Sequence, residues 1–223
     1  MSLKPSKKSD MGKDWMKKRR DKPILIQPEY HLIVTEGTDT EPQYFARMKE
    51  IINGKYRGRI HMDIFGEGDN TLSLFDKARK RALSSSNTYK HVWVIYDTDS
   101  FPAEHINQTA ELCVEYSTEE TQYHAIWSNQ CIELWFLLHF SYLHSDIDRK
   151  GYWPKLSKWL NDLGCGNYAK NREDMYDILS PKMETAIRYA EKLDKENQGK
   201  SPANSAPGTK VYELVRKLKP YLQ

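Results

Sequence analysis

The sequence has few cysteines and no pattern that pairs them. Its 223 residues include three, Cys113, Cys131 and Cys165, which lie far apart and form no CxxC pair. This spacing argues against a disulfide framework and against a zinc site built on cysteine pairs, and it is typical of a reducing compartment. The histidines form no zinc-binding motif either, because the sequence contains no HExxH pattern.

Long apolar runs and glycine-rich nucleotide motifs are also missing. No stretch approaches the roughly 18 apolar residues that cross a bilayer, and the lysine-rich start lacks the apolar segment of a signal peptide. We therefore expect a cytoplasmic protein without a membrane segment. The sequence contains neither a P-loop nor a GxGxxG, so any control by nucleotides would have to come from a partner protein.

The net charge is small but unevenly distributed. The chain carries a formal charge of +3, yet residues 1–22 hold nine Lys or Arg against three Asp, and the remainder is net negative. Two interpretations of this basic arm remain open. It is either a disordered, solubilising segment or a segment that binds the phosphates of nucleic acid.

Strands and helices are expected to alternate through residues 23–145, and helices alone through residues 146–223. Four strand–helix units in succession predict an α/β domain with a central parallel sheet of about four strands. The helical part is expected to pack on the same domain, and residues 198–208 have the composition of a flexible linker. The expected strands cover residues 31–37, 59–65, 91–97 and 124–128, and the expected helices follow Thr40 and cover residues 71–83, 102–116 and 131–140.

Carboxylates follow two of the predicted strands. Glu36 ends the first strand, and Asp97 and Asp99 end the third. Alternate residues of an extended chain point the same way, so Asp97 and Asp99 would repel each other unless a cation lay between them. The carboxyl ends of parallel strands form one edge of a sheet, where sites of α/β proteins are found. We therefore expect these acids to converge on a divalent cation.

Two further acids are candidates for the same site. Glu41 lies in the first turn of the helix after Thr40, and Glu133 is the one charged residue in the apolar stretch 131–138. A buried, unpaired carboxylate costs several kcal/mol, and Mg²⁺ or Mn²⁺ would offset that cost. Simpler roles remain open for both. Glu41 would complement the helix dipole, and Glu133 would accept backbone N–H groups. Thr40 and Gln43 also predict a capping box.

A carboxylate cluster holding such a cation suits phosphoryl chemistry. The segment "DTDS" is also similar to the motif of haloacid-dehalogenase-type phosphatases, in which the first Asp is a nucleophile. Those enzymes usually have Thr or Val where Phe101 stands here, and their motif opens the fold. A glycosyltransferase DxD is a further alternative.

The order of a first-strand Glu and a later DxD resembles the Toprim domain of topoisomerases, primases and overcoming-lysogenization-defect nucleases. Four segments resemble the RloB family of bacterial proteins, which is associated with restriction loci and anti-phage defence, and the resemblance runs from Ile24 to the C-terminus. These segments are "LIVTEGTDTEPQYF", "YKHVWVIYDTDS", "SNQCIELWFLLHF" and "GTKVYELVRKL". The resemblance implies a Toprim-like nuclease that uses Mg²⁺ or Mn²⁺ to cut RNA, tRNA included, or DNA.

The resemblance also implies roles for single residues. Glu36 matches the general base or acid and metal ligand, and Asp97 and Asp99 match the DxD ligands. Glu41 resembles a second Glu of the related nucleases with one extra residue of spacing. Glu133 resembles their later acid, with Ser128 five residues before it.

A basic residue is expected to assist the leaving group in such an enzyme. Lys210 in the "GTKV" segment and Lys182 are the two candidates that the sequence offers. Both would otherwise be ordinary surface lysines. Among the histidines, His139 is the best candidate for a chemical role, because it follows Glu133 in the same predicted helix.

Two rival functions remain open. One is a non-catalytic Toprim-like module that binds nucleic acid or a partner protein, such as an ATPase of a defence system. The other is a phosphatase acting on small molecules. Aromatic residues of the helical part would either stack on bases or pack in the core; they are Tyr152, Trp153, Trp159, Tyr168 and Tyr176.

Overall fold

The computed structural model describes residues 28–68, 71–98 and 101–222. Asp99 and the basic arm predicted for residues 1–22 lie outside these described residues. Within the described ranges, no helix has both the length and the apolar character that spanning a membrane requires.

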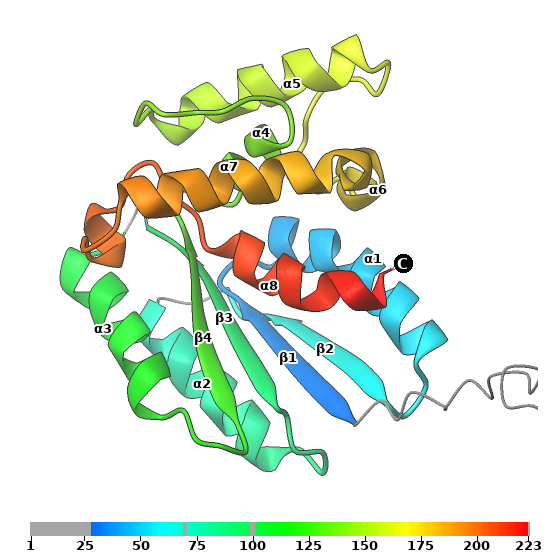
Figure 1. Ribbon diagram of the computed structural model, residues 1–223, viewed down its shortest axis with the longest axis vertical. Coiled ribbons are helices and arrows are strands. Elements are labelled where there is room, and N and C mark those ends of the chain that lie inside the picture. The colour runs from blue at the N-terminus through cyan, green and yellow to red at the C-terminus, as the bar shows by residue number, and fades with distance from the viewer. Residues whose placement is uncertain (1–27, 69–70, 99–100, 223) are drawn as a thin grey trace, which may run out of the picture.

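Four parallel strands form the central sheet, in the order β2-β1-β3-β4 (Figure 1). The strands are β1 (Glu29–Thr35), β2 (Ile60–Gly66), β3 (His91–Asp97) and β4 (Gln122–Ser128). This arrangement, with helices on both faces, confirms the predicted α/β class. The third strand has the bounds that its apolar run predicts, whereas β1 and β4 each begin two residues earlier than expected.

Three crossover helices cover the two faces of the sheet. They are α1 (Thr40–Lys55), α2 (Thr71–Ser84) and α3 (Ala103–Glu115). Side chains of a strand alternate between its faces, so Ile33 packs with α1 while Leu32 and Val34 pack with α2. Both sets are fully buried, as expected for a parallel sheet covered on each side.

The C-terminal helices extend the core on the face that α1 covers. They share one apolar cluster with α1 and the sheet, so residues 146–222 and the α/β part have a common core. The α-helices that follow β4 are α4 (Glu133–Leu138), α5 (Tyr152–Asp162), α6 (Met175–Leu179), α7 (Met183–Glu196) and α8 (Val211–Leu218). Single 3₁₀ turns occur at Arg149–Gly151, Ser180–Lys182, Pro202–Asn204 and Lys219–Tyr221.

The segment after α7 is packed, which corrects the prediction of a flexible linker at residues 198–208. The side-chain amide of Asn197 donates to the carbonyl of Pro207 at 2.8 Å. The backbone N–H of Asn129 donates to the carbonyl of Gly208 at 2.8 Å, and Ser205 is buried. A composition rich in Pro, Gly and Ser indicates the local backbone options, but it carries no information on these long-range hydrogen bonds.

The predicted capping box at the start of α1 is absent from the structure. Asp39 is the N-cap residue, and its side chain makes no capping hydrogen bond. Thr40 lies inside the helix and donates its hydroxyl to the carbonyl of Lys170 at 3.0 Å. The first turn of α1 is therefore tied to a loop of the C-terminal part, which brings that loop to the carboxyl edge of the sheet.

Candidate functional site

A crevice opens where β1 and β3 lie side by side. The helix after β1 packs on one face of the sheet, and the helix after β3 packs on the other. The chain thus leaves the two strands in opposite directions. Ligand sites of open α/β sheets form at this kind of switch point, outside the carboxyl ends of the strands. Glu36 directly follows β1, and Asp97 is the last residue of β3.

Glu36 and Asp97 are joined across the strand ends. The backbone N–H of Glu36 donates to the carbonyl of Ile95 at 2.9 Å, which continues the β1–β3 ladder by one residue. The backbone N–H of Asp97 then donates to the Glu36 carboxylate at 3.2 Å. This bond holds the Glu36 carboxylate at the main chain of Asp97, and both side chains are half-buried.

Glu41 is buried at the first turn of α1, with 5% of its surface exposed. Burial raises its pKa to about 7, and the negative charges of Glu133 and Asp39 add to this effect while Lys170 opposes it. Gly37 makes room for the carboxylate, because a Cβ atom there would lie 2.1 Å from Glu41 Oε2. The cleft thus holds a carboxyl group that is costly to ionise without a nearby cation.

Glu133 is also buried, and uncharged side chains donate hydrogen bonds to its carboxylate. Its Oε1 accepts the hydroxyl of Tyr168 at 2.8 Å and the indole N–H of Trp153 at 3.1 Å. The neighbouring thiol of Cys131 has a pKa well above its usual range, because it is buried and faces the charges of Glu133 and Asp97. A thiolate nucleophile at Cys131 is therefore disfavoured.

These acids line a single cleft of about 570 Å³. Glu36 comes from the end of β1, Glu41 from α1, Asp97 from the end of β3 and Glu133 from the start of α4. The structure therefore brings together every predicted acid that it describes. Their assigned roles in catalysis or metal binding stay predictions.

Two cations line the same cleft and are absent from the sequence-based prediction. Arg149 lies in the turn before α5, where its backbone N–H donates to the side chain of Gln130 at 2.7 Å. Lys170 lies in the loop that accepts the Thr40 hydroxyl. No periodicity or spacing links these loops to the strand ends, so only the tertiary fold identifies them as site residues.

The two lysines predicted to assist the leaving group lie elsewhere. Lys210 Nζ pairs with Asp194 at 2.7 Å and with Glu213 at 3.0 Å, and it does not line the cleft. Lys182 lies over the ring of Phe140, 4.8 Å from its centroid. The backbone of Lys210 lies beside the end of β4, but its side chain pairs with carboxylates of α7 and α8. The cleft cations Arg149 and Lys170 are better placed for this role.

His139 belongs to the core. It is 1% exposed, its Nδ1 lies 2.9 Å from the carbonyl of Trp135, and burial lowers its pKa to about 4. It does not line the cleft. Its position therefore gives no support to a chemical role.

The aromatic residues of the helical part divide between core and site. Tyr152 and Tyr176 are buried, and Trp159 stacks on Phe140. Tyr168 and Trp153 instead bind the cleft residue Glu133. Core packing is therefore confirmed for Tyr152 and Tyr176, and base stacking stays a prediction.

The donors in the cleft suit a hard cation in their chemistry. They are carboxylate oxygens from separate elements, the ligands that Mg²⁺ and Mn²⁺ prefer. The raised pKa of Glu41 and the space left by Gly37 fit the same group. Among the described residues, which exclude Asp99, no three Asp, Glu, His or Cys side chains are already arranged as a ligand set.

Comparison with known proteins gives one family. The family model described as RloB-like protein matches residues 31–218, a range that includes every residue lining the cleft. No curated protein and no solved structure matches the chain. The match extends from β1 to the end of α8 and covers most of the sequence. The chain therefore belongs to the RloB-like family.

Proposed function

We propose that this protein is a metal-dependent nuclease that hydrolyses the phosphodiester bonds of RNA or DNA in bacterial anti-phage defence. One observation carries the proposal. Glu36, Glu41, Asp97 and Glu133 converge with two cations in a single cleft at the switch point of a parallel sheet. The proposal places the protein in the cytoplasm. It also includes an ATPase as a partner that supplies any control by nucleotides, because the sequence lacks the common nucleotide-binding motifs.

Mg²⁺ or Mn²⁺ is the proposed cofactor, with Glu36, Asp97 and Asp99 as its principal ligands and with Glu41 and Glu133 beside them. When bound, such an ion supplies Lewis-acid polarisation of the phosphate. A positive charge at this place would also favour ionised Glu41, whose pKa is raised by burial and by its acidic neighbours.

The remaining steps fall to side chains of the cleft. Glu36 is proposed as the general base, because the backbone N–H of Asp97 holds its carboxylate at the strand end. Arg149 and Lys170 are proposed to stabilise the charge that develops on the phosphate and the leaving oxygen. Tyr168 and Trp153 orient Glu133 through its Oε1.

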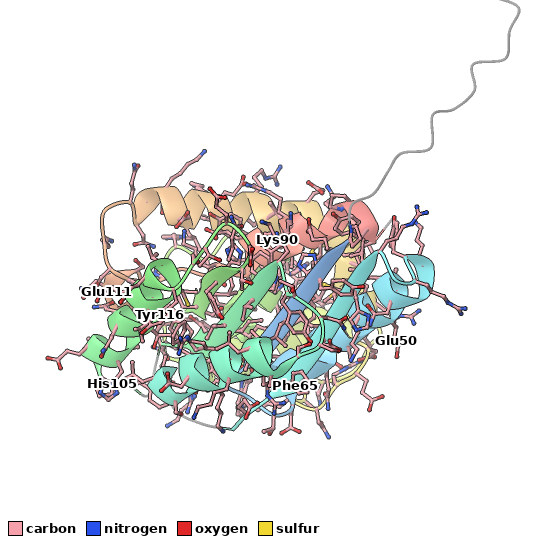
Figure 2. The ribbon with its side chains drawn as sticks, turned by 90° about the horizontal axis from the view of Figure 1, so that it is seen from below. Glu50, Phe65, Lys90, His105, Glu111 and Tyr116 are labelled. Atoms are coloured by element: carbon pink, nitrogen blue, oxygen red, sulfur yellow. The ribbon has the colours of Figure 1, made fainter. Side chains whose placement is uncertain are left out.

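A cleavage assay tests this proposal. Purified protein is incubated with total tRNA, mRNA, plasmid and single-stranded DNA in Mg²⁺, Mn²⁺ or EDTA. We expect cleavage in the metal buffers and a loss of about two orders of magnitude or more in Asp97→Asn. Glu111→Gln is the matched control, because Glu111 is an exposed carboxylate on α3 (Figure 2) and does not line the cleft. Equal cleavage by wild type and Asp97→Asn would contradict the proposal.

A non-catalytic module is the second candidate. It is favoured by the neutral donors on Glu133. Thermal melting separates the two functions. An enzyme predicts that Mg²⁺ or Mn²⁺ raises the melting temperature of the wild type but not of Asp97→Asn. The binding module predicts no metal-dependent shift in either protein.

A further inference from the structure

An exposed aromatic ring stands at the rim of the acidic cleft. Trp153, at the start of α5, is 42% exposed. Most large aromatic side chains of the described residues are buried, so this exposure calls for a physical reason. Tyr116, which is 38% exposed, packs against Phe75 and lies under the guanidinium of Arg79 on the opposite face of the sheet (Figure 2). Trp153 instead bonds to a residue of the cleft.

A hydrogen bond to the buried Glu133 fixes the orientation of the Trp153 ring. Its indole N–H donates to Glu133 Oε1 at 3.1 Å, and the Tyr168 hydroxyl donates to the same oxygen at 2.8 Å. Glu133 itself is 2% exposed, so the anchor is buried while the ring is not. A ring held in this way loses little conformational entropy when a ligand stacks on it.

A cation lies next to the same ring. Lys170 Nζ is 5.2 Å from the centroid of the Trp153 ring, and Lys170 also lines the cleft. The Thr40 hydroxyl holds the backbone of Lys170 to the first turn of α1 at 3.0 Å. The rim therefore presents an aromatic ring with an ammonium group over one of its faces, at the edge of a cleft lined with acids, so a base would stack on the other face.

This pair has the chemistry of a nucleotide-binding platform. A nucleotide carries a flat base and a phosphate one short linkage apart, and bases stack on aromatic side chains without regard to sequence. The faces of a base in an intact duplex are covered by its neighbours, so such a ring can accept only a base that is unpaired or displaced.

We infer that Trp153 stacks on an unpaired base of the nucleic acid strand and that Lys170 binds the neighbouring phosphate, so that the cleft takes single-stranded or looped segments in preference to intact duplex. The inference rests on the proposed function, because it assumes that nucleic acid enters the cleft. It names the class of substrate that the cleft would accept.

Equilibrium binding tests the inference without any need for cleavage. Fluorescence anisotropy compares a labelled single-stranded oligonucleotide with its blunt-ended duplex, in EDTA and in Ca²⁺. We expect tighter binding of the single strand. Trp153→Ala should weaken that binding by about five-fold or more and leave duplex binding unchanged. Lys170→Ala should weaken it and reduce the slope of log K against log salt by about 0.7.

Two variants separate stacking from a structural effect. Trp153→Phe keeps an aromatic face but loses the N–H donor to Glu133, so stacking predicts that it retains most of the binding. Tyr116→Ala removes a similarly exposed aromatic ring elsewhere and should leave binding unchanged. Equal weakening by Tyr116→Ala, an equal loss of duplex binding in Trp153→Ala, or no binding of the single strand by the wild type would overturn the inference. Selective binding without metal-dependent cleavage would count against the nuclease alone.

Discussion

At the scale of single residues, the cleft contains a carboxyl group whose ionised form is destabilised. Burial raises the pKa of Glu41 from its ordinary value of 4.5 to about 7. The folded state therefore holds more protons than the unfolded state between these two values, and stability falls as the pH rises through them. The ionised side chain costs on the order of 3 kcal/mol above pH 7 in the absence of a cation.

Glu41→Gln should relieve this cost. We expect the variant to melt about 4 °C or more above the wild type at pH 8 in EDTA, because the amide carries no charge to bury. The difference should shrink toward zero at pH 4.5, where the wild-type carboxyl is protonated. Scanning calorimetry at the two pH values measures this, with Glu111→Gln as the exposed control. A variant less stable than the wild type at pH 8 would contradict the account of Glu41.

Alanine substitutions at two glycines are expected to change the stability of the protein in opposite directions. A Cβ atom at Gly37 would lie 2.1 Å from Glu41 Oε2, whereas a Cβ atom at Gly54 in α1 would meet no atom within 4 Å. We expect Gly37→Ala to destabilise the protein by about 1–3 kcal/mol and Gly54→Ala to stabilise it by up to about 1 kcal/mol. Urea denaturation measures both. A neutral Gly37→Ala would show that the carboxylate of Glu41 can move aside freely.

At the scale of elements, prediction from the sequence succeeds where the signal is local. The strand His91–Asp97 is a continuous apolar run that ends in acids, and the structure has the same bounds. The switch-point rule likewise places Glu36 beside Asp97. The capping box at Thr40 failed because its hydroxyl has a partner 130 residues away, at Lys170. Long separations in sequence from the strand ends also explain why Arg149 and Lys170 could not be assigned to the site.

The loop after α7 provides a test at this scale. Asn197 is buried and donates to the carbonyl of Pro207, and its Oδ1 accepts the Lys200 ammonium at 2.8 Å. Asn197→Ala should destabilise the protein by about 1–3 kcal/mol, because it leaves a buried carbonyl without its donor. Asn204 is exposed on the same loop, and Asn204→Ala should have little effect. Equal melting temperatures for Asn197→Ala and the wild type would contradict this packing and favour the flexible linker that the composition predicts.

At the scale of the whole molecule, the two ends of the sheet differ in the ionisable side chains that they carry. The carboxyl end carries the acidic cleft, and the opposite end carries His31, His91 and His124 around Trp93. His91 Nδ1 lies 2.9 Å from His124 Nε2. Burial lowers the pKa of His91 to about 3 and that of His124 to about 4. Both rings are therefore neutral in the folded protein at pH 7.

Acidification should destabilise the fold through His91 and His124. Below about pH 6.5 the unfolded chain protonates these histidines and the folded chain does not, so stability is lost as the pH falls toward 4. The buried His139 acts in the same direction, whereas Glu41 opposes it. We expect a lower melting temperature at pH 5 than at pH 7. An unchanged or higher value at pH 5 would contradict neutral, buried histidines.

We propose that the acids at the carboxyl edge of the sheet form a hydrolytic site for phosphodiesters. The most direct test is the rate of nucleic acid cleavage in Mg²⁺, with wild type, Asp97→Asn and Glu111→Gln measured side by side. We expect cleavage by the wild type and Glu111→Gln, abolished by EDTA, and a loss of about two orders of magnitude or more in Asp97→Asn. No metal-dependent cleavage by the wild type, together with no metal-dependent rise in its melting temperature, would contradict it.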